Sequence, residues 1–227
     1  METTLPGIKS LRVFFSYSTT DKDIVGKIKH YLELIGFEVF LAHEDIEPTI
    51  QWEEEIQKNL SMADIFVAIL TTEFKKSDWT DQETGMAIAG DKFIIPVQIE
   101  LTPYGFINKY QSLRVNGELS NIEQAIANKI STAIIKSPRF KDGAKGFIIN
   151  ALAESKSFDQ GGARSKLLAD FESFSENEVK YIYKATMENS QLYASFVAQY
   201  PLKTFFQKYA EYLSEDELSA MIEKIKR

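Results

Sequence analysis

The sequence predicts a doubly wound α/β domain with a parallel sheet, followed by a small all-α domain. Two patterns carry this prediction. Strands that are hydrophobic along their whole length alternate with helical segments in the first part of the chain, and only helical periodicity follows later. A stretch with several glycines separates the two patterns. We therefore expect domains at residues 9–137 and 163–227, joined by a linker at 138–162.

Five hydrophobic runs rich in β-branched and aromatic side chains are expected to form the sheet. They cover residues 12–17, 37–42, 64–70, 93–98 and, less regularly, 113–115. Ligands of doubly wound sheets bind beyond the carboxyl ends of the strands. Three polar segments follow these ends, at residues 16–21, 43–51 and 71–83, and are expected to converge on one edge of the sheet.

Helix start signals mark the segments between strands and the C-terminal domain. Capping boxes, in which a Ser or Thr precedes an acidic residue by three positions, begin at Thr20, Ser120, Ser175 and Ser214. Asp78 is expected to cap another helix, with Trp79 as its first residue. Pro201 is expected to separate two helices, because proline disrupts a helix interior. The linker is expected to hold a strand at residues 147–152.

Glu83 carries the strongest functional signal in the sequence. Trp79, Glu83 and Ala87 recur at helical spacing and therefore share one face of the expected helix. A carboxylate on the same stripe as an indole and a small apolar residue faces the protein and is partly desolvated. Such a group is either paired with another side chain or functional. The pattern alone leaves both interpretations open.

The composition argues against several classes of site. With no cysteine and two histidines, the chain is not expected to form disulfides, a multi-histidine metal site or a Ser-His-Asp triad. Residues 1–137 hold 13 Lys and Arg against 20 Asp and Glu, so nucleic acid is not expected as the main partner. No glycine fingerprint follows the first strand, and no P-loop is present. We expect neither a metal nor a bound cofactor.

The sequence also lacks the signals of a membrane or secreted protein. No apolar run approaches the roughly 20 residues that a membrane span needs. The first residues, METTLPGIKS, contain no basic region followed by an apolar core. We therefore expect a cytoplasmic protein that does not act in a membrane.

Residues 9–137 resemble the Toll/interleukin-1 receptor (TIR) domain family in four motifs. VFFSYS at 13–18 looks like the first box of the family, and 44–52 occupies the place of its BB loop. ADIFVAILT matches the third strand, and SDWTDQE at 77–83 matches the serine, tryptophan and glutamate arrangement whose glutamate is catalytic in TIR enzymes. The resemblance implies a flavodoxin-like doubly wound sheet. Residues 163–227 resemble no family that we can name.

The motifs resemble in particular the NAD-cleaving, prokaryotic type of TIR domain, and this resemblance implies an activity. Such a domain cleaves the bond between nicotinamide and ribose, so NAD+ is a substrate and not a cofactor. The expected function is that of an NAD+ glycohydrolase or ADP-ribosyl cyclase in anti-phage defence, with hydrolysis and cyclisation both open. Two residues depart from the family pattern: Thr49 stands where bacterial members usually carry Gly, and Thr80 stands where Cys or Arg is common.

The resemblance also implies site residues and partners. Glu83 would be catalytic, and the substrate would contact a set of residues from three segments: Ser16, Tyr17, Ser18, Asp45, Ile46, Ser77 and Trp79. The amides after Ser16 would hold the pyrophosphate, or the segment would only form a helix-capping loop. Trp79 would line the nicotinamide pocket or belong to the core, and Ser77 would orient Glu83 or extend the cap.

Family members often assemble through TIR–TIR contacts, so other TIR domains and a homo-oligomer are expected as partners. In such assemblies the BB loop of one subunit lies beside the glutamate of another. The alternative function is a non-catalytic TIR interaction module in which Glu83 is purely structural.

Overall fold

The structure, a computed structural model, describes residues 5, 7, 10–41, 52–115 and 121–225. Within it the chain forms two compact units. The sheet unit comprises Ser10–Glu33 and Phe37–Ser131, and the helical unit comprises Met1–Lys9, Leu34–Gly36 and Thr132–Arg227.

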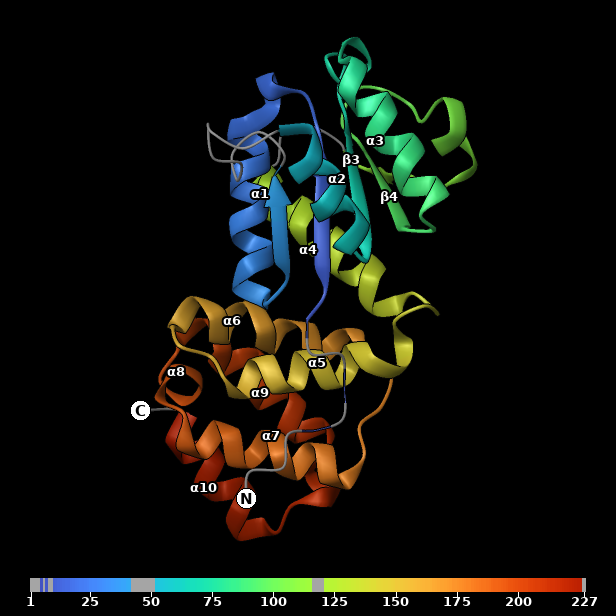
Figure 1. The fold of residues 1–227 in the computed structure, drawn as a ribbon. Coiled ribbons are helices and arrows are strands. Elements are labelled where there is room, and N and C mark those ends of the chain that lie inside the picture. Colours follow the sequence, from blue (N-terminus) through green and yellow to red (C-terminus); the bar gives the residue numbers. More distant parts are fainter. Residues whose placement is uncertain (1–4, 6, 8–9, 42–51, 116–120, 226–227) are drawn as a thin grey trace. The chain divides into compact units, whose positions relative to one another are not determined.

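The sheet unit contains a five-stranded sheet in which every pair of neighbouring strands is parallel (Figure 1). The strand order is β2-β1-β3-β4-β5. The strands are β1 (Arg12–Ser16), β2 (Glu38–Leu41), β3 (Ile65–Leu70), β4 (Phe93–Gln98) and β5 (Leu113–Arg114). All five lie where the hydrophobic runs predicted them. The order and direction confirm the flavodoxin-like doubly wound sheet.

Helices cover both faces of this sheet. They are α1 (Lys22–Ile35), α2 (Trp52–Met62), α3 (Asp78–Ala89) and α4 (Ile122–Lys136). One face carries Phe14, Phe66 and alternate neighbours in a cluster with apolar residues of α2 and α3. Right-handed crossovers place α1 on the opposite face, because the chain reverses its direction across the sheet after β2. An ion pair of 2.9 Å between Lys27 and Glu123 joins α4 to α1.

The start of α3 differs from the prediction. Asp78 is the first helical residue and is exposed, and the N-cap position belongs to Ser77. The Ser77 side chain makes no capping hydrogen bond. The hydroxyl of Thr80 instead donates to the carbonyls of Phe74 and Ser77, at 2.7 and 2.8 Å. The start of α3 is thus held by the side chain of Thr80, a residue of its first turn. The prediction that Asp78 caps the helix was wrong.

The other predicted helix starts have mixed outcomes. Thr20 lies within a short 3-10 turn, η1 (Thr19–Asp21), and α1 begins after that turn, so the capping box expected there was wrong. Gly36 ends α1 with φ of 122°, a left-handed conformation that glycine adopts without strain. Ser120 lies outside the described residues.

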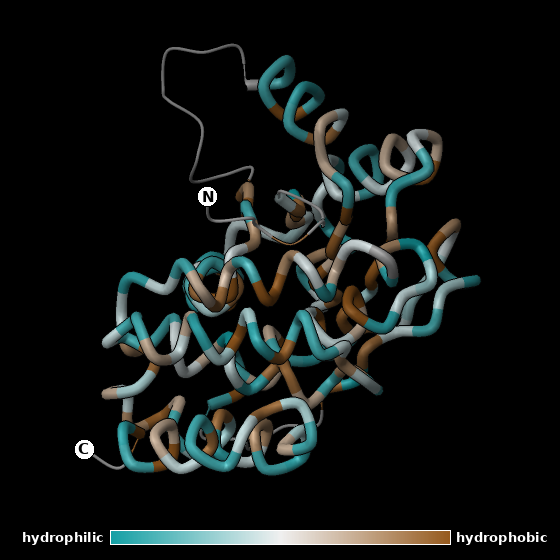
Figure 2. The backbone as a smooth tube through the Cα atoms, turned by 90° about the horizontal axis from the view of Figure 1, so that it is seen from below, coloured by the Kyte–Doolittle hydropathy of each residue, from teal (hydrophilic) through white to brown (hydrophobic). Residues whose placement is uncertain are grey.

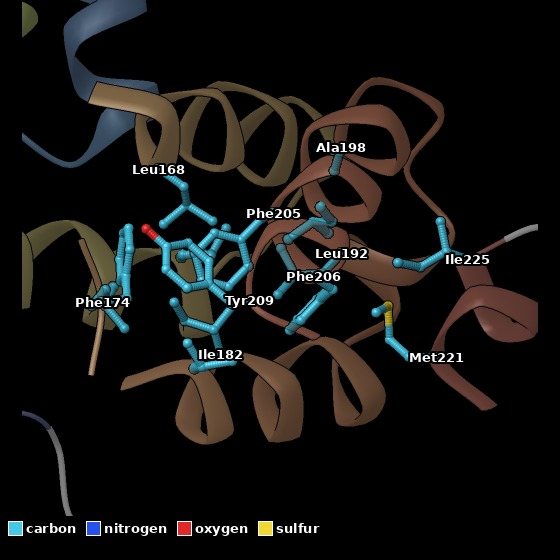
Figure 3. Packing of buried hydrophobic residues seen from close by; sticks show 14 residues of the cluster. Leu168, Phe174, Ile182, Leu192, Ala198, Phe205, Phe206, Tyr209, Met221 and Ile225 are labelled. Atoms are coloured by element: carbon cyan, nitrogen blue, oxygen red, sulfur yellow. The ribbon is translucent and has the colours of Figure 1, made fainter. Parts of the chain in front are cut away.

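The helical unit contains six helices in its described part. They are α5 (Lys141–Ala153), α6 (Phe158–Lys166), α7 (Glu176–Glu188), α8 (Ser190–Tyr193), α9 (Phe196–Lys208) and α10 (Glu215–Ile225). Figure 2 shows hydrophobic and hydrophilic residues alternating along these helices, as in amphipathic helices that share a core. Figure 3 shows that core, in which aromatic rings from α9 pack against apolar side chains of α7 and α10.

The expectation of a linker at 138–162 was wrong, as was the strand expected at 147–152. These residues form α5 and the start of α6. Gly161 and Gly162, which suggested flexibility, are required by close packing. A Cβ at Gly161 would lie 2.3 Å from the carbonyl oxygen of Gln191, and one at Gly162 would lie 2.7 Å from Val197. The glycine pair therefore lets α6 approach the segment that leads into α9.

Two capping boxes of the helical unit are confirmed. Ser175 and Glu178 exchange both hydrogen bonds of the motif, and Ser214 and Glu217 do the same. Pro201, in contrast, lies inside α9 and does not divide it. The buried stripe that includes Ala198, Leu202 and Phe205 continues across the proline. Burial of that stripe outweighs the hydrogen bond that proline removes.

No helix in the described ranges is both long and apolar enough to span a membrane.

The core of the helical unit gives a stability prediction. Phe206 is completely buried and lies edge-to-face with Phe205, at 5.2 Å between ring centroids. Phe206→Ala should lower the free energy of unfolding of this unit by about 3–5 kcal/mol, because it removes apolar burial and leaves a cavity. Urea unfolding followed by circular dichroism measures the change. The exposed neighbour Gln207 supplies the control, since Gln207→Ala should change stability by no more than about 0.5 kcal/mol. Equal effects of both variants would contradict this packing.

Candidate functional site

The candidate site lies at the carboxyl edge of the sheet, where β1 and β3 end. Ser16 is the last residue of β1 and is in register with Ala68 of β3. Its side chain is on the same face as that of Phe14, which is the face covered by α2 and α3. The end of β1 is therefore opposite the helix that carries Glu83.

The side chains of Ser16 and Glu83 meet in the protein interior. The Ser16 hydroxyl donates to Oε2 of Glu83 at 2.5 Å. Ser16 is fully buried and Glu83 is 1% exposed. The other carboxyl oxygen of Glu83, Oε1, is buried and has no hydrogen-bond partner within the described part of the chain. Glu83 is thus held by one oxygen and leaves the other able to accept a hydrogen bond.

Burial strongly affects the acidity of this carboxyl group. Desolvation raises the pKa of Glu83 to about 7, and the hydrogen bond from Ser16 opposes that rise only in part. No ion pair with Glu83 exists among the described residues, so the hydrogen bond from Ser16 offsets only part of the cost of burying its charge. The group is therefore close to half ionised at neutral pH. A carboxyl in this condition can respond to a nearby positive charge by releasing its proton.

A hydrogen-bonded network supports the beginning of α3. The Thr71 hydroxyl, directly after β3, donates to Oδ2 of Asp21 at 2.7 Å. It accepts the backbone N–H of Phe74 at 3.2 Å. The carbonyl of Phe74 in turn accepts the hydroxyl of Thr80, which is one turn before Glu83. Burial raises the pKa of Asp21, an effect that the hydrogen bond from Thr71 opposes.

Thr71 and Thr84 are features that the sequence analysis missed. Thr80, Glu83, Thr84 and Ala87 are the buried residues of α3, which makes its inner face unusually polar. The hydroxyl of Thr84 is buried and has no hydrogen-bond partner in the residues that the structure describes. The spacing of Thr80 and Thr84, four residues apart, was a signal for a shared inner face. No local signal connects Thr71 to Asp21, because 50 residues separate them.

The remaining predicted site residues have different surroundings. Tyr17 is 1% exposed, and the Ser18 hydroxyl lies 3.0 Å from that of Thr20 at the entry to α1. Trp79 is half-buried on α3. Ser77 makes no side-chain bond to Glu83, and the hydroxyl that contacts Glu83 is that of Ser16. Asp45 and Ile46 lie outside the described residues.

Two cavities of the sheet unit are lined by other residues. One of about 410 Å³ is lined by residues that include Arg12, Glu38 and Asn59, and one of about 350 Å³ lies along α1 near His30. Glu83 lines neither of them. No cluster of three or more metal-ligating side chains occurs in the part of the chain described.

The raised pKa of Glu83 predicts a pH-dependent stability. The folded protein binds this proton more tightly than the unfolded chain, so its contribution is complete below pH 4.5 and is lost as the pH rises through about 7. Relative to Glu83→Gln, the wild type should lose about 3 kcal/mol between pH 4.5 and pH 8, at 1.36 kcal/mol per unit of pKa. Denaturant unfolding followed by tryptophan fluorescence measures this difference, since Trp52 and Trp79 both belong to the sheet unit.

The exposed Asp78 on the same helix provides a charge-matched control. Asp78→Asn removes one negative charge but no buried group, so it should not reproduce this pH dependence. If the two substitutions give the same pH dependence, Glu83 is not desolvated as described.

Comparisons with known proteins agree with the motifs at this edge. A family model described as the TIR domain matches residues 13–131, more than half of the chain. Among solved structures, the TIR domain of the Toll-related receptor TRR-2 from Hydra magnipapillata is similar to this chain at 18% identity and a TM-score of 0.41. That match covers 45% of this chain and 82% of the Hydra chain. No curated protein matches the sequence. The extent of the family match shows that this chain belongs to the TIR domain family.

Proposed function

We propose that this chain is a TIR enzyme that cleaves the nicotinamide–ribose bond of NAD+. One observation carries the proposal: the buried carboxyl of Glu83 at the carboxyl edge of the sheet is held by Ser16 through one oxygen, and its other oxygen has no partner in the described residues. A group of this kind, with a strongly raised pKa, is typical of functional sites.

The chemistry needs little more than one carboxylate. Nicotinamide leaves a cationic substrate as a neutral molecule, so the general acid of ordinary glycosidases is unnecessary. The main task is to stabilise the oxocarbenium-like ribose. Glu83 supplies a negative charge for this purpose, and Oε1 accepts a hydrogen bond from a ribose hydroxyl.

The pKa of Glu83 fits this role. The carboxyl is close to half ionised at pH 7 when the site is empty. The positive charge of the nicotinamide ring favours the ionised form when the substrate is bound. Substrate binding and activation of the carboxylate are therefore coupled, and the negative charge is present mainly when there is a cation beside it.

Other parts of the substrate meet the groups predicted from the sequence. The pyrophosphate binds the backbone amides that follow Ser16 and lead through η1 into α1, where no basic side chain is required. Trp79 lines the nicotinamide side of the site. Asp45 and Ile46 contribute from the BB loop, and assembly with other TIR domains in a homo-oligomer brings that loop to the glutamate of a neighbouring subunit.

The acceptor of the ribosyl group determines the product. Water gives hydrolysis to ADP-ribose, and an adenine nitrogen of the same substrate gives a cyclic ADP-ribose. Either outcome serves prokaryotic anti-phage defence, through NAD+ depletion or through a signal molecule. Product chromatography distinguishes the two.

One observation favours a second candidate function. The Ser16–Glu83 hydrogen bond joins β1 to α3 and thereby stabilises the sheet unit without any ligand. In a non-catalytic TIR interaction module, this structural role would be the whole role of Glu83.

The decisive experiment compares purified wild type with Glu83→Gln at several protein concentrations. Nicotinamide release from NAD+ should fall at least 10²- to 10³-fold in the variant, the usual loss when a preorganised electrostatic group is removed. Asp78→Asn should retain the wild-type rate, because it removes an exposed charge from the same helix. If the wild type is inactive at every concentration, the enzyme proposal fails and the interaction module is favoured. If Glu83→Gln is as active as the wild type, Glu83 is not the catalytic group.

A pH profile tests the proposed role of the carboxylate separately. Catalysis requires ionised Glu83, so kcat/KM should rise with pH through about 7 and then level off. Ser16→Ala removes a hydrogen bond that stabilises the charged form, and therefore the midpoint of this rise should move to higher pH. A midpoint that does not change in Ser16→Ala would show that another group controls the profile.

A further inference from the structure

An exposed aromatic surface stands out on the helical unit. Phe196 is 89% exposed, Tyr200 79%, Phe158 50% and Val197 43%. These four, which we call the aromatic patch, are two thirds of the six exposed large hydrophobic side chains among the described residues. Single exposed hydrophobic residues are ordinary, but a group of this kind marks an interaction site.

The four residues belong to one firmly built surface. Phe196, Val197 and Tyr200 occupy the first turns of α9, with Phe196 and Tyr200 one turn apart. The hydroxyl of Ser195, the N-cap of α9, donates to the carbonyl of Phe158 at 3.1 Å and so connects the starts of α9 and α6. Close packing of Gly162 against Val197 brings the same two helices together. Little conformational entropy is therefore lost when this surface binds a partner.

The charge around the patch limits the kind of partner. Residues 189–202 contain no Lys, Arg, Asp or Glu, and beside Phe158 there are one basic and one acidic exposed residue, Lys156 and Asp159, whose charges balance. Nucleic acid and anionic membrane surfaces require Lys and Arg, which this stretch lacks. Aromatic residues without charges are instead typical of the core of a protein–protein interface.

The exposed area is suited to half of a dimer interface. Aromatic side chains bury about 150–250 Å² each, so the exposed parts of the three rings present roughly 400 Å². A standard interface takes about 800 Å² from each partner, with an apolar core and a polar rim. Two copies of the patch would supply such a core, and the surrounding polar residues would supply the rim.

We infer that the aromatic patch is the contact surface for a second copy of this chain. A two-fold interface uses the same surface on both subunits, so it must be compatible with itself. The helical unit meets this condition, because residues 138–227 hold 13 basic and 13 acidic side chains and their copies do not repel each other. Residues 1–137, with seven more acidic than basic side chains, are less suited to meeting their own copy. The inference does not depend on NAD+ cleavage.

The test measures the mass of the full chain by sedimentation equilibrium from low to high micromolar concentration. The wild type should form a dimer. The double variant Phe196→Gln/Tyr200→Gln, which keeps good helix formers at both positions, should weaken dimerisation at least tenfold. Phe106, 76% exposed in the turn η3 (Gly105–Lys109) of the sheet unit, is the matched control, and Phe106→Gln should dimerise like the wild type.

A second variant keeps the test decisive if the first one folds poorly by circular dichroism. Phe158→Gln, on α6, alters the same patch from another helix and should also weaken the dimer at least threefold. A monomeric wild type at high micromolar concentration would overturn the inference, as would folded patch variants that dimerise like the wild type. A wild-type monomer that co-sediments with neutral phosphatidylcholine vesicles, while the patch variants do not, would assign the surface to a membrane instead.

Discussion

The hydrogen bond between Ser16 and Glu83 is the interaction on which the candidate site depends. Burying a carboxyl group without a cation is unfavourable, and one hydrogen bond offsets only part of that cost. The fold imposes this arrangement, because the packing of α3 on the sheet fixes the direction of the Glu83 side chain. α3 packs its inner face on the sheet with Ala87, which is one turn beyond Glu83, and this packing directs the carboxyl group into the interior.

The same requirement explains the polar network at the entry to α3. A helix that exposes its first residues and carries a buried acid on its inner face gains little from hydrophobic burial near its start. Hydrogen bonds, in place of hydrophobic contacts, therefore fix the position of the start of α3. Thr80 fixes the preceding turn through two carbonyls, and Thr71 connects that turn to Asp21 beyond β1. The network connects α3 to Thr71, directly after β3, and to Asp21 in η1, so the position of Glu83 is tied to the carboxyl edge of the sheet. Such support from rigid elements is what a site with exact geometry requires.

Local patterns in the sequence were sufficient to predict the strands of the sheet, but they did not predict the side-chain contacts between distant segments of the chain. Hydrophobic runs located the first four strands because a buried parallel strand needs apolar side chains on both faces, and the short β5 lies in the less regular stretch at 113–115. The helical stripe correctly predicted that Glu83 is buried. Its partner was not predicted: Ser77 was expected to orient Glu83 or to extend the cap, whereas the contact comes from Ser16, which is 67 residues away and is brought close only by the fold. The family match extends only over residues 13–131, and the helical unit had to be interpreted from periodicity alone.

In the helical unit, the wrong predictions came from glycine and proline, because each of these residue types occurs in two different structural contexts. Glycine marks a flexible linker or a close approach of two backbones, and Gly161 has the second role because the carbonyl of Gln191 occupies the space of a side chain. Proline ends a helix unless burial on both sides of it compensates, as it does around Pro201. In both cases the deciding contact comes from another segment of the chain.

The charge distribution connects the two proposals. In the proposed reaction, the anionic pyrophosphate of NAD+ is held by backbone amides of the acidic sheet unit in place of basic side chains. Amides hold an anion more strongly when water is excluded from around them, because the local dielectric constant is then lower. An enzyme with such a site benefits from a neighbouring subunit that covers it, but two acidic surfaces resist close approach. The contact that we infer for the aromatic patch would overcome this repulsion by raising the local concentration of one sheet unit near another, as linked binding sites do in general. The sheet units then need only a weak contact of their own. Taken together, the two proposals tie NAD+ cleavage by the sheet unit to assembly through the helical unit.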